Sequence, residues 1–224
     1  MASIHVIGLG PAGPDLVSTG SAQLIQTVPI QFLRTRRHPA ASIMASAASF
    51  DHHYESLETF DDVYAAIVGD LFAAAGQDQT VLYAVPGSPV VAEQTVQMLL
   101  AQSRSQEVEV NVHPAMSFLD LTWVRLGIDP VALGVKIVDG HRFLETLPSD
   151  GGPALIAQCE SRQTLSDIKL ALEADTNMQV TMLQRLGLSE EVITTLNWAD
   201  IDRGPEPDHL TSLYVEDLRG ELLD

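Results

Sequence analysis

Short apolar runs alternate with amphipathic segments of helical periodicity along the first half of the chain, and this alternation constrains the fold most. Residues 3–9 and 80–85 predict buried strands, and residues 61–72 carry apolar side chains at helical spacing behind two carboxylates. Turns rich in Gly and Pro follow both strands. Strands that alternate with helices are typical of an α/β fold with a mainly parallel sheet.

The second half has more strands for each helix, which predicts a mixed sheet there. We place the boundary near Pro114, giving domains at residues 1–113 and 114–224. The remaining expected strands are 29–34, 108–112, 135–138, 154–158, 178–183, 192–196 and 210–215, and the remaining helices are 16–27, 90–103, 117–126 and 161–174, while residues 42–54 stay ambiguous.

Composition narrows the class of partner. The 224 residues include 30 Asp and Glu against 12 Lys and Arg, a formal charge of −18 that disfavours nucleic acid and anionic membranes. No apolar run approaches the ~20 residues of a membrane span, and the N-terminus lacks the pattern of a signal peptide. The single cysteine, Cys159, is expected to be a small buried side chain in a cytoplasmic protein.

Loops at the predicted carboxyl ends of strands are where α/β proteins bind ligands. Four such loops, at residues 8–11, 86–88 and 114–117 and at Gln158, are expected to line one cleft. The first has the pattern G-x-G-P-x-G, which supports a dinucleotide site only weakly. The sequence identifies no catalytic residues, and it predicts no metal site because zinc-ligand spacings are absent and His52 and His53 are adjacent.

One basic cluster stands out in this acidic chain. Arg34, Arg36, Arg37 and His38 follow a predicted strand. They are placed either to grip an anionic group of a substrate or to form a surface loop paired with nearby acidic residues. The sequence leaves both interpretations open.

Several stretches, in order, resemble the tetrapyrrole (corrin/porphyrin) methylase superfamily, and most closely the methylase-like N-terminal domain of MazG-type nucleotide pyrophosphohydrolases. The resemblance extends over nearly the whole chain, and it is the order of the motifs that makes it specific. The matching stretches are VIGLGPAGPDL at 6–16, FLRTRRHP at 32–39, FDDVY at 60–64, YAVPGSPVVAE at 83–93, LGIDP at 126–130, LIAQ at 155–158, SDIKL at 166–170 and HLTSLYV at 209–215.

The resemblance implies two α/β domains with S-adenosylmethionine in the cleft between them, a small-molecule substrate and a homodimer. The implied cofactor contacts are Pro11, Gly87, Ser88, Val91, Ser117, Phe118, Gln158, Leu186 and Leu213. Tyr64 matches a substrate-side tyrosine of relatives that methylate peptide backbone nitrogens, but Thr59 stands where those relatives have Arg. The expected substrate-binding residues are therefore Tyr64, Arg34, Arg36 and Arg37.

The function implied by the resemblance is an S-adenosylmethionine-dependent methyltransferase with an unidentified acceptor. The alternative is a catalytically silent regulatory or interaction domain associated with a MazG-type pyrophosphohydrolase domain or partner. Ser88 and Ala115, which stand where the family usually has Asp and Gly, favour this alternative. A third interpretation is a nucleotide-binding domain that uses residues 8–13 with the arginine cluster.

Overall fold

The computed structural model describes residues 2–76, 78–147 and 151–222. The chain divides into two compact units, unit 1 at Met1–Leu121 and unit 2 at Thr122–Asp224. The sequence places the domain boundary at Pro114, whereas the division between the units falls inside helix α5 (Phe118–Leu126). Each unit has its own sheet, and among the described helices none is both long and apolar enough to cross a membrane.

Unit 1 is built on a five-stranded sheet with the order β3-β2-β4-β1-β5. Every pairing in it is parallel, as the alternation of strands and helices predicts. In the register, Ser3 lies opposite both Thr80 and Glu109. The strands are β1 (Ser3–Gly8), β2 (Ile30–Leu33), β3 (Ala48–Ser49), β4 (Thr80–Val85) and β5 (Glu109–Val112).

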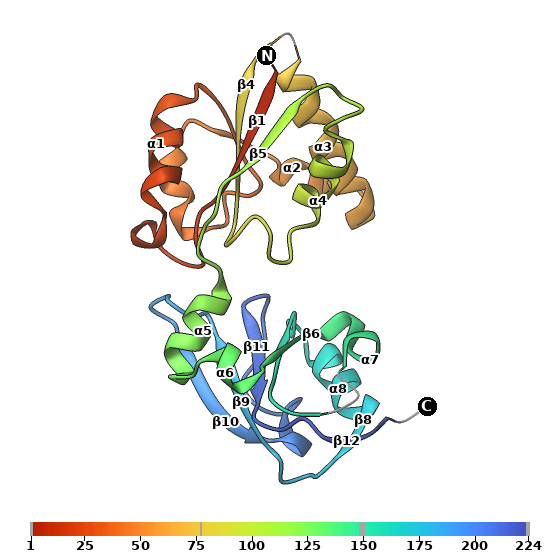
Figure 1. Ribbon diagram of the computed structural model, residues 1–224. Coiled ribbons are helices and arrows are strands. Elements are labelled where there is room, and N and C mark those ends of the chain that lie inside the picture. The colour runs from red at the N-terminus through yellow and green to blue at the C-terminus, as the bar shows by residue number, and fades with distance from the viewer. Residues whose placement is uncertain (1, 77, 148–150, 223–224) are drawn as a thin grey trace. The chain divides into compact units, whose positions relative to one another are not determined.

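Helices cover both faces of this sheet (Figure 1). One face carries α1 (Thr19–Thr27) and the 3-10 helices η1 (Pro14–Leu16) and η2 (Pro39–Met44), and the other carries α2 (Asp51–Ser56), α3 (Phe60–Ala75) and α4 (Gln94–Gln102). Tyr83 of β4 packs in the core beneath α3, and its neighbours Leu82 and Ala84 pack in the core on the opposite face. A strand buried on both faces explains why residues 80–85 are continuously apolar.

Local capping decides where the helices of unit 1 begin. The Ser18 hydroxyl accepts a hydrogen bond from the Ser21 amide at 3.1 Å, so α1 begins after Ser18 and later than the sequence predicts. Thr59 caps α3 in the same way through the Asp62 amide at 3.2 Å. Helix α4 also begins later than predicted, because Ala92 has a φ of 52°, which no helical residue adopts.

Unit 2 contains a mixed sheet with the order β10-β9-β11-β7-β6, as predicted. Strand β6 runs parallel to β7, and the other pairings are antiparallel. In the register, Leu213 of the central strand lies opposite Ile156 and Met182. The strands are β6 (Lys136–Asp139), β7 (Ala154–Ala157), β9 (Gln179–Gln184), β10 (Val192–Asn197) and β11 (Thr211–Val215).

The core of unit 2 lies between this sheet and the helices α7 (Phe143–Thr146) and α8 (Arg162–Ala171), together with the 3-10 helix η4 (Trp198–Asp200). Cys159 is fully buried in it, which confirms the expectation for this side chain. The predicted helix at 161–174 is wrong in its last turn. There the chain enters β8 (Leu172–Ala174), which pairs antiparallel with β12 (Gly220–Leu222).

In unit 2, besides β8 and β12, the sequence pattern does not predict α7, η4, α6 (Pro130–Leu133) or the 3-10 helix η3 (Gly140–Arg142). Asp129 caps α6 by accepting from the Val131 and Ala132 amides, and Asp139 caps η3 by accepting from the His141 amide. Both are too brief to show a helical period, so only their capping residues mark them in the sequence.

Candidate functional site

Three loops of unit 1 meet at the carboxyl ends of its strands. Gly10, after β1, and Gly87, after β4, form an isolated antiparallel bridge. The Gly87 amide donates to the Gly10 carbonyl at 2.8 Å, and the Gly10 amide donates to the Gly87 carbonyl at 3.2 Å. A Cβ atom added to Gly8 would lie 2.1 Å from the Gly87 oxygen and 2.5 Å from Cβ of Ala115. The structure therefore brings together the three loops of unit 1 that the sequence singles out.

The loop after β4 presents open backbone to its surroundings. Gly87 has a φ of 64°, a conformation that favours glycine, and no atom lies within 4 Å of the position a Cβ would take. Ser88 is buried, and the Val91 amide donates to its carbonyl at 3.2 Å, which closes a turn. Pro11 follows the bridged Gly10 and is half-buried. A bare backbone of this kind permits close approach of a ligand, so the loop suits a cofactor bound mainly through main-chain contacts.

Ser117 has a structural task at the start of α5. Its amide and its hydroxyl both donate to the Asp120 carboxylate, at 2.7 and 3.1 Å, and the Leu119 amide donates to the hydroxyl at 3.2 Å. Ser117 is buried, and Phe118 is the first residue of α5. These bonds satisfy donors at the helix N-terminus. A cofactor contact from either residue stays a prediction.

The predicted site residues of unit 2 are in different environments. Gln158, at the end of β7, has an exposed side chain and a φ of 60°. Arg185, at the end of β9, has a φ of 52° and precedes the buried Leu186. Left-handed backbone at residues other than glycine costs about 1–3 kcal/mol and clusters at functional sites. Leu213 is fully buried in the core, so its side chain is occupied by packing.

Arg34 lies at the centre of a polar network at the carboxyl edge of the unit 1 sheet. Its guanidinium forms an ion pair with Glu93, and its Nε donates to the Tyr54 hydroxyl at 2.9 Å. The same guanidinium lies 5.6 Å from the ring centroid of Tyr64, within the range of a cation–π contact. The structure thus brings together two predicted substrate residues, Arg34 and Tyr64.

Glu93 explains why this network is buried. The side chain of Glu93 is only 2% exposed, and its second oxygen accepts a hydrogen bond from Thr95 Oγ1 at 2.7 Å. The Tyr83 hydroxyl lies 3.0 Å from the same Thr95 oxygen. Burial, followed by the negative charge of Glu93, raises the pKa of Tyr83 well above its usual value. For Arg34, burial acts to lower the pKa, but Glu93 and Tyr54 outweigh it, so the pKa is raised and the guanidinium stays charged.

No pattern in the sequence indicates a role for Glu93 or Tyr54. Glu93 ends the motif at 83–93, but a carboxylate just before a helix is ordinarily a solvated capping residue. Because Glu93 already neutralises Arg34, the arginine does not present a free positive charge to an anionic substrate. A substrate at this network would instead meet tyrosine rings and hydroxyl groups around a guanidinium that is held in place.

Arg36 and Arg37 are directed elsewhere. The Arg36 guanidinium donates to the carbonyls of Ala45 and Ala47, and its amide donates to the Asp51 carboxylate at 2.9 Å. Arg37 forms an exposed ion pair with Glu55 at 3.9 Å. The structure therefore separates the arginine cluster: Arg34 joins the buried network, and Arg37 fits the interpretation as a surface loop paired with acidic residues.

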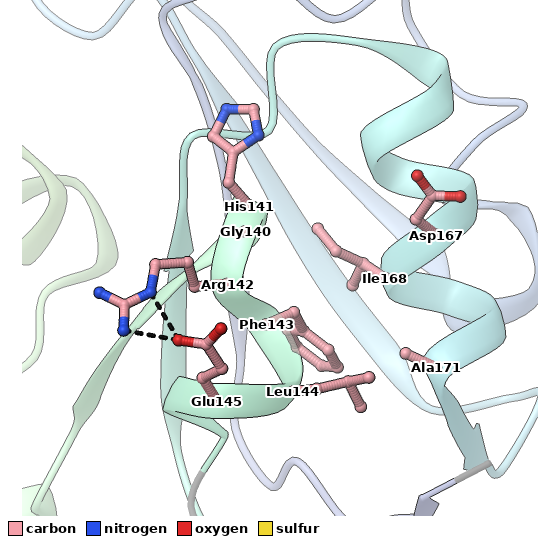
Figure 2. Close-up of a pocket in the computed structure, with 9 residues that line it drawn as sticks. All are labelled: Gly140, His141, Arg142, Phe143, Leu144, Glu145, Asp167, Ile168 and Ala171. Atoms are coloured by element: carbon pink, nitrogen blue, oxygen red, sulfur yellow. Dashed lines mark hydrogen bonds and ion pairs between the residues drawn. The ribbon is translucent and has the colours of Figure 1, made fainter. Parts of the chain in front are cut away.

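Two surface hollows stand out among the described residues, and the second lies beside the loop after β1 because His38 contacts the backbone of Gly10. Figure 2 shows the first hollow, which has a volume of about 260 Å³ and lies in unit 2. Its walls are η3 and α7 on one side and α8 on the other, and Arg142 forms an ion pair with Glu145 beside it. The second, of about 340 Å³ in unit 1, is lined by Arg36, His38 and η2. Burial lowers the pKa of His38, against a hydrogen bond with the backbone of Gly10 that acts to raise it. Arg36 and His38 of the predicted basic cluster both line the second hollow.

Comparison with known proteins identifies the class. A model of the family Tetrapyrrole (Corrin/Porphyrin) Methylases matches residues 3–202, so the chain belongs to this family. In sequence it is 33% identical over 226 residues to the uncharacterized protein YabN of Bacillus subtilis (strain 168), a match over 98% of this chain and 46% of YabN. The chain thus spans about half the length of the curated relative it matches.

Solved structures show the same fold. Uroporphyrin-III-C-methyltransferase from Thermus thermophilus superposes with a TM-score of 0.74 at 17% identity, over 96% of this chain and 94% of that chain. Another structure of that enzyme, complexed with S-adenyl homocysteine, has a TM-score of 0.67 at 15% identity, over 96% of this chain and 97% of that chain. At such low identity these matches establish the α/β fold of the family and leave the substrate undetermined.

Proposed function

We propose that the protein is an S-adenosylmethionine-dependent methyltransferase of the tetrapyrrole methylase family that acts on a small-molecule acceptor. The observation that carries this proposal is the open glycine backbone at Gly87, bridged to Gly10 at the carboxyl edge of the parallel sheet. Family membership and a related fold complexed with S-adenyl homocysteine support it. Neither identifies the acceptor.

Main-chain groups of unit 1 would hold the cofactor, namely those of Pro11, Gly87, Ser88 and Val91, with Ser117 and Phe118 in the following loop. Gln158, Leu186 and Leu213 are the proposed contacts from unit 2. The bound cofactor supplies an already activated methyl group on a sulfonium, so the protein's task is to align the acceptor. The field of a chain with a formal charge of −18 favours a cationic sulfonium over the product left after methyl transfer.

Arg34, Tyr54 and Tyr64 are the proposed acceptor side. Because the Arg34–Glu93 pair is neutral as a whole, this surface suits a planar acceptor with hydrogen-bonding edges better than one rich in carboxylates. The exposed Phe60 stacks on Tyr64 at a centroid distance of 6.1 Å and extends the aromatic surface.

The test is calorimetric titration of the full chain with S-adenosylmethionine and with S-adenosylhomocysteine. We expect Gly87→Ala to weaken both by at least about 10-fold, because a Cβ would occupy the open space at the loop. Gly134→Ala is the matched control, since Gly134 has a φ of 66° and the same open surroundings but ends α6 in unit 2. The proposal fails if the wild-type chain binds neither compound.

A second candidate rests on the length of the sequence relative. Because YabN is about twice as long as the matched region, the methylase fold is joined there to a further segment. The alternative function, which the resemblance of the motifs suggests, is a regulatory or interaction domain for a MazG-type pyrophosphohydrolase domain, without methyl transfer. Co-purification with such a pyrophosphohydrolase, together with an absence of cofactor binding, would favour it. Light scattering of the purified chain tests the proposed homodimer separately.

A further inference from the structure

His52 and His53 of α2 and Asp70 of α3 form a cluster on unit 1 that the proposed function does not use. Each offers one ligand atom, and these atoms all lie within 4.8 Å of one another. Within residues 2–76, 78–147 and 151–222, no other group of three metal-ligating side chains has this spacing. His53 and Asp70 are 17 positions apart in the sequence, so only the packing of α2 against α3 brings them together.

Adjacent positions on a helix point about 100° apart, which is why the sequence argues against a shared ion at His52 and His53. In the structure the two side chains nevertheless lie together. The two imidazole rings lie with their centroids 4.1 Å apart and their planes tilted by 40°. The buried Phe50 ring stacks on His53 at 5.8 Å and 15°, which restrains the His53 ring.

One hydrogen bond of the cluster leaves a ligand atom of His52 available, and another holds the ligand atoms of His53 and Asp70 side by side. His52 Nδ1 lies 3.1 Å from the Ser49 carbonyl, an acceptor, so Nδ1 carries the hydrogen and Nε2 keeps its lone pair. A metal-bound histidine typically donates its other ring nitrogen to a backbone carbonyl in this way. His53 Nε2 donates a hydrogen bond to Asp70 Oδ2 at 2.8 Å, so a bound ion would take the place of that hydrogen. The separation of the two atoms is close to the ~3 Å between two ligands bound to one ion at about 2.0–2.1 Å.

The donor set selects the kind of ion. Two imidazoles and one carboxylate suit zinc and its neighbours in the first transition row, whereas magnesium and calcium take oxygen ligands. His52 is exposed and the Asp70 side chain is 52% exposed, so an ion has access and keeps a position for water. The net negative charge of the chain favours a cation at its surface.

We propose that His52, His53 and Asp70 bind one divalent transition-metal ion of the zinc type, with water completing its coordination. The ion joins α2 to α3 at the surface. The next residue of α2 is Tyr54, whose hydroxyl accepts the hydrogen bond from Arg34, so the ion also restrains one wall of the polar network. This site does not depend on the proposed methyltransferase function.

The experiment uses the full untagged chain after treatment with a chelator and dialysis. Zn²⁺ is titrated by calorimetry, and Co²⁺ is added separately to record its visible absorption, which reports the coordination geometry. We expect one Zn²⁺ per chain. Loss of an outer partner of a metal ligand already costs about 10–100-fold in affinity, so His53→Ala and Asp70→Asn should each weaken binding at least as much. His52→Ala should abolish the Co²⁺ band.

The matched control is His141→Ala. His141 Nε2 pairs with Glu160 at 3.0 Å, a surface histidine–carboxylate pair like His53–Asp70 but outside any group of three among the described residues. Its loss should leave Zn²⁺ affinity unchanged. Zn²⁺ should also raise the unfolding temperature of the wild type and not of Asp70→Asn, and a cooperative unfolding transition of Asp70→Asn without Zn²⁺ confirms that the variant folds. The proposal is wrong if the wild type takes up no Zn²⁺ or if the cluster variants bind it as tightly.

Discussion

Single glycines decide how closely the loops of unit 1 approach one another. The Gly8–Gly87 contact leaves no room for a side chain, whereas Gly69, in the middle of α3, has no atom within 4 Å of the position a Cβ would take. Gly8 and Gly69 are chemically identical, so the difference between these two positions lies entirely in their surroundings. Alanine substitution at Gly8 measures the effect of tight packing on stability, and alanine substitution at Gly69 measures the effect of helix propensity.

We expect Gly8→Ala to lower the free energy of unfolding by about 1–3 kcal/mol, because the new methyl group must displace backbone and Ala115. Gly69→Ala, the control, should raise it by roughly 0.5–1 kcal/mol, because alanine loses less backbone entropy in a helix. Urea denaturation of both variants measures the changes. An unchanged Gly8→Ala variant would contradict the close packing of the loops.

Among the elements, polar pairs that are buried or half-buried connect strands to the segments beside them. The Arg34–Glu93 pair joins the end of β2 to the residue before α4. His5 of β1 and His113, just after β5, form a second link, with Nδ1 of one ring 2.9 Å from Nε2 of the other. Each link makes a different prediction.

Glu93→Ala should lower the free energy of unfolding by about 3–5 kcal/mol, because it leaves the largely buried Arg34 charge without its partner. The double variant Arg34→Met with Glu93→Leu should lose much less than the sum of the two single changes, since apolar side chains replace both charges. A double-mutant cycle in urea measures this coupling. Additive losses would show that the two charges do not depend on each other.

The histidine pair makes stability depend on pH. Burial, and then the proximity of His5, lower the pKa of His113 from 6.5 in the folded chain. The unfolded chain therefore binds this proton more readily, so the free energy of unfolding should fall as pH drops from 7 through 6.5 toward 5. His113→Gln should reduce that fall, and His209→Gln, at an exposed position, should not. Denaturation of the wild type and both variants at pH 5, 6, 7 and 8 tests this prediction. It is wrong if the free energy of unfolding changes with pH by the same amount in all three proteins.

At the scale of the whole molecule, the excess of negative charge opposes the compact state. The chain has 30 acidic and 12 basic side chains, and many acidic groups face solvent. Self-repulsion of this kind is screened by salt, since the screening length falls from about 30 Å at 0.01 M to about 10 Å at 0.1 M ionic strength. Unit 1 and unit 2 both carry exposed carboxylates, so both should respond.

We expect the unfolding temperature at pH 8 to rise between 0.01 and 0.1 M NaCl, as screening weakens the repulsion. The rise should be smaller at pH 5, where carboxylates begin to take up protons and the net charge is lower. Calorimetric scans at the two pH values and two salt concentrations measure it. A fall in unfolding temperature with salt would mean that surface ion pairs such as Arg125–Glu191 outweigh the repulsion.

Elements whose signals are local could be predicted from the amino-acid sequence alone. The apolar run at 80–85, the acidic start of the helix at 60–75 and the glycine loop after β1 all follow from propensity, periodicity and capping. It also indicated the loops that meet at the carboxyl edge of the unit 1 sheet. The buried state of Cys159 and the mixed sheet of unit 2 were predicted on the same grounds.

Contacts between side chains that are distant in the sequence became visible only in the folded chain. Arg34 and Glu93 are 59 positions apart, and no periodicity along the chain reports that one neutralises the other. The same holds for His53 and Asp70, and for residues 172–174, which leave the predicted helix to pair with β12. Local interactions determine where helices and strands form, but the partner of a buried charge or of a strand edge depends on how those elements pack. A buried polar group is costly without a partner, and that partner can come from any part of the chain that packs against it.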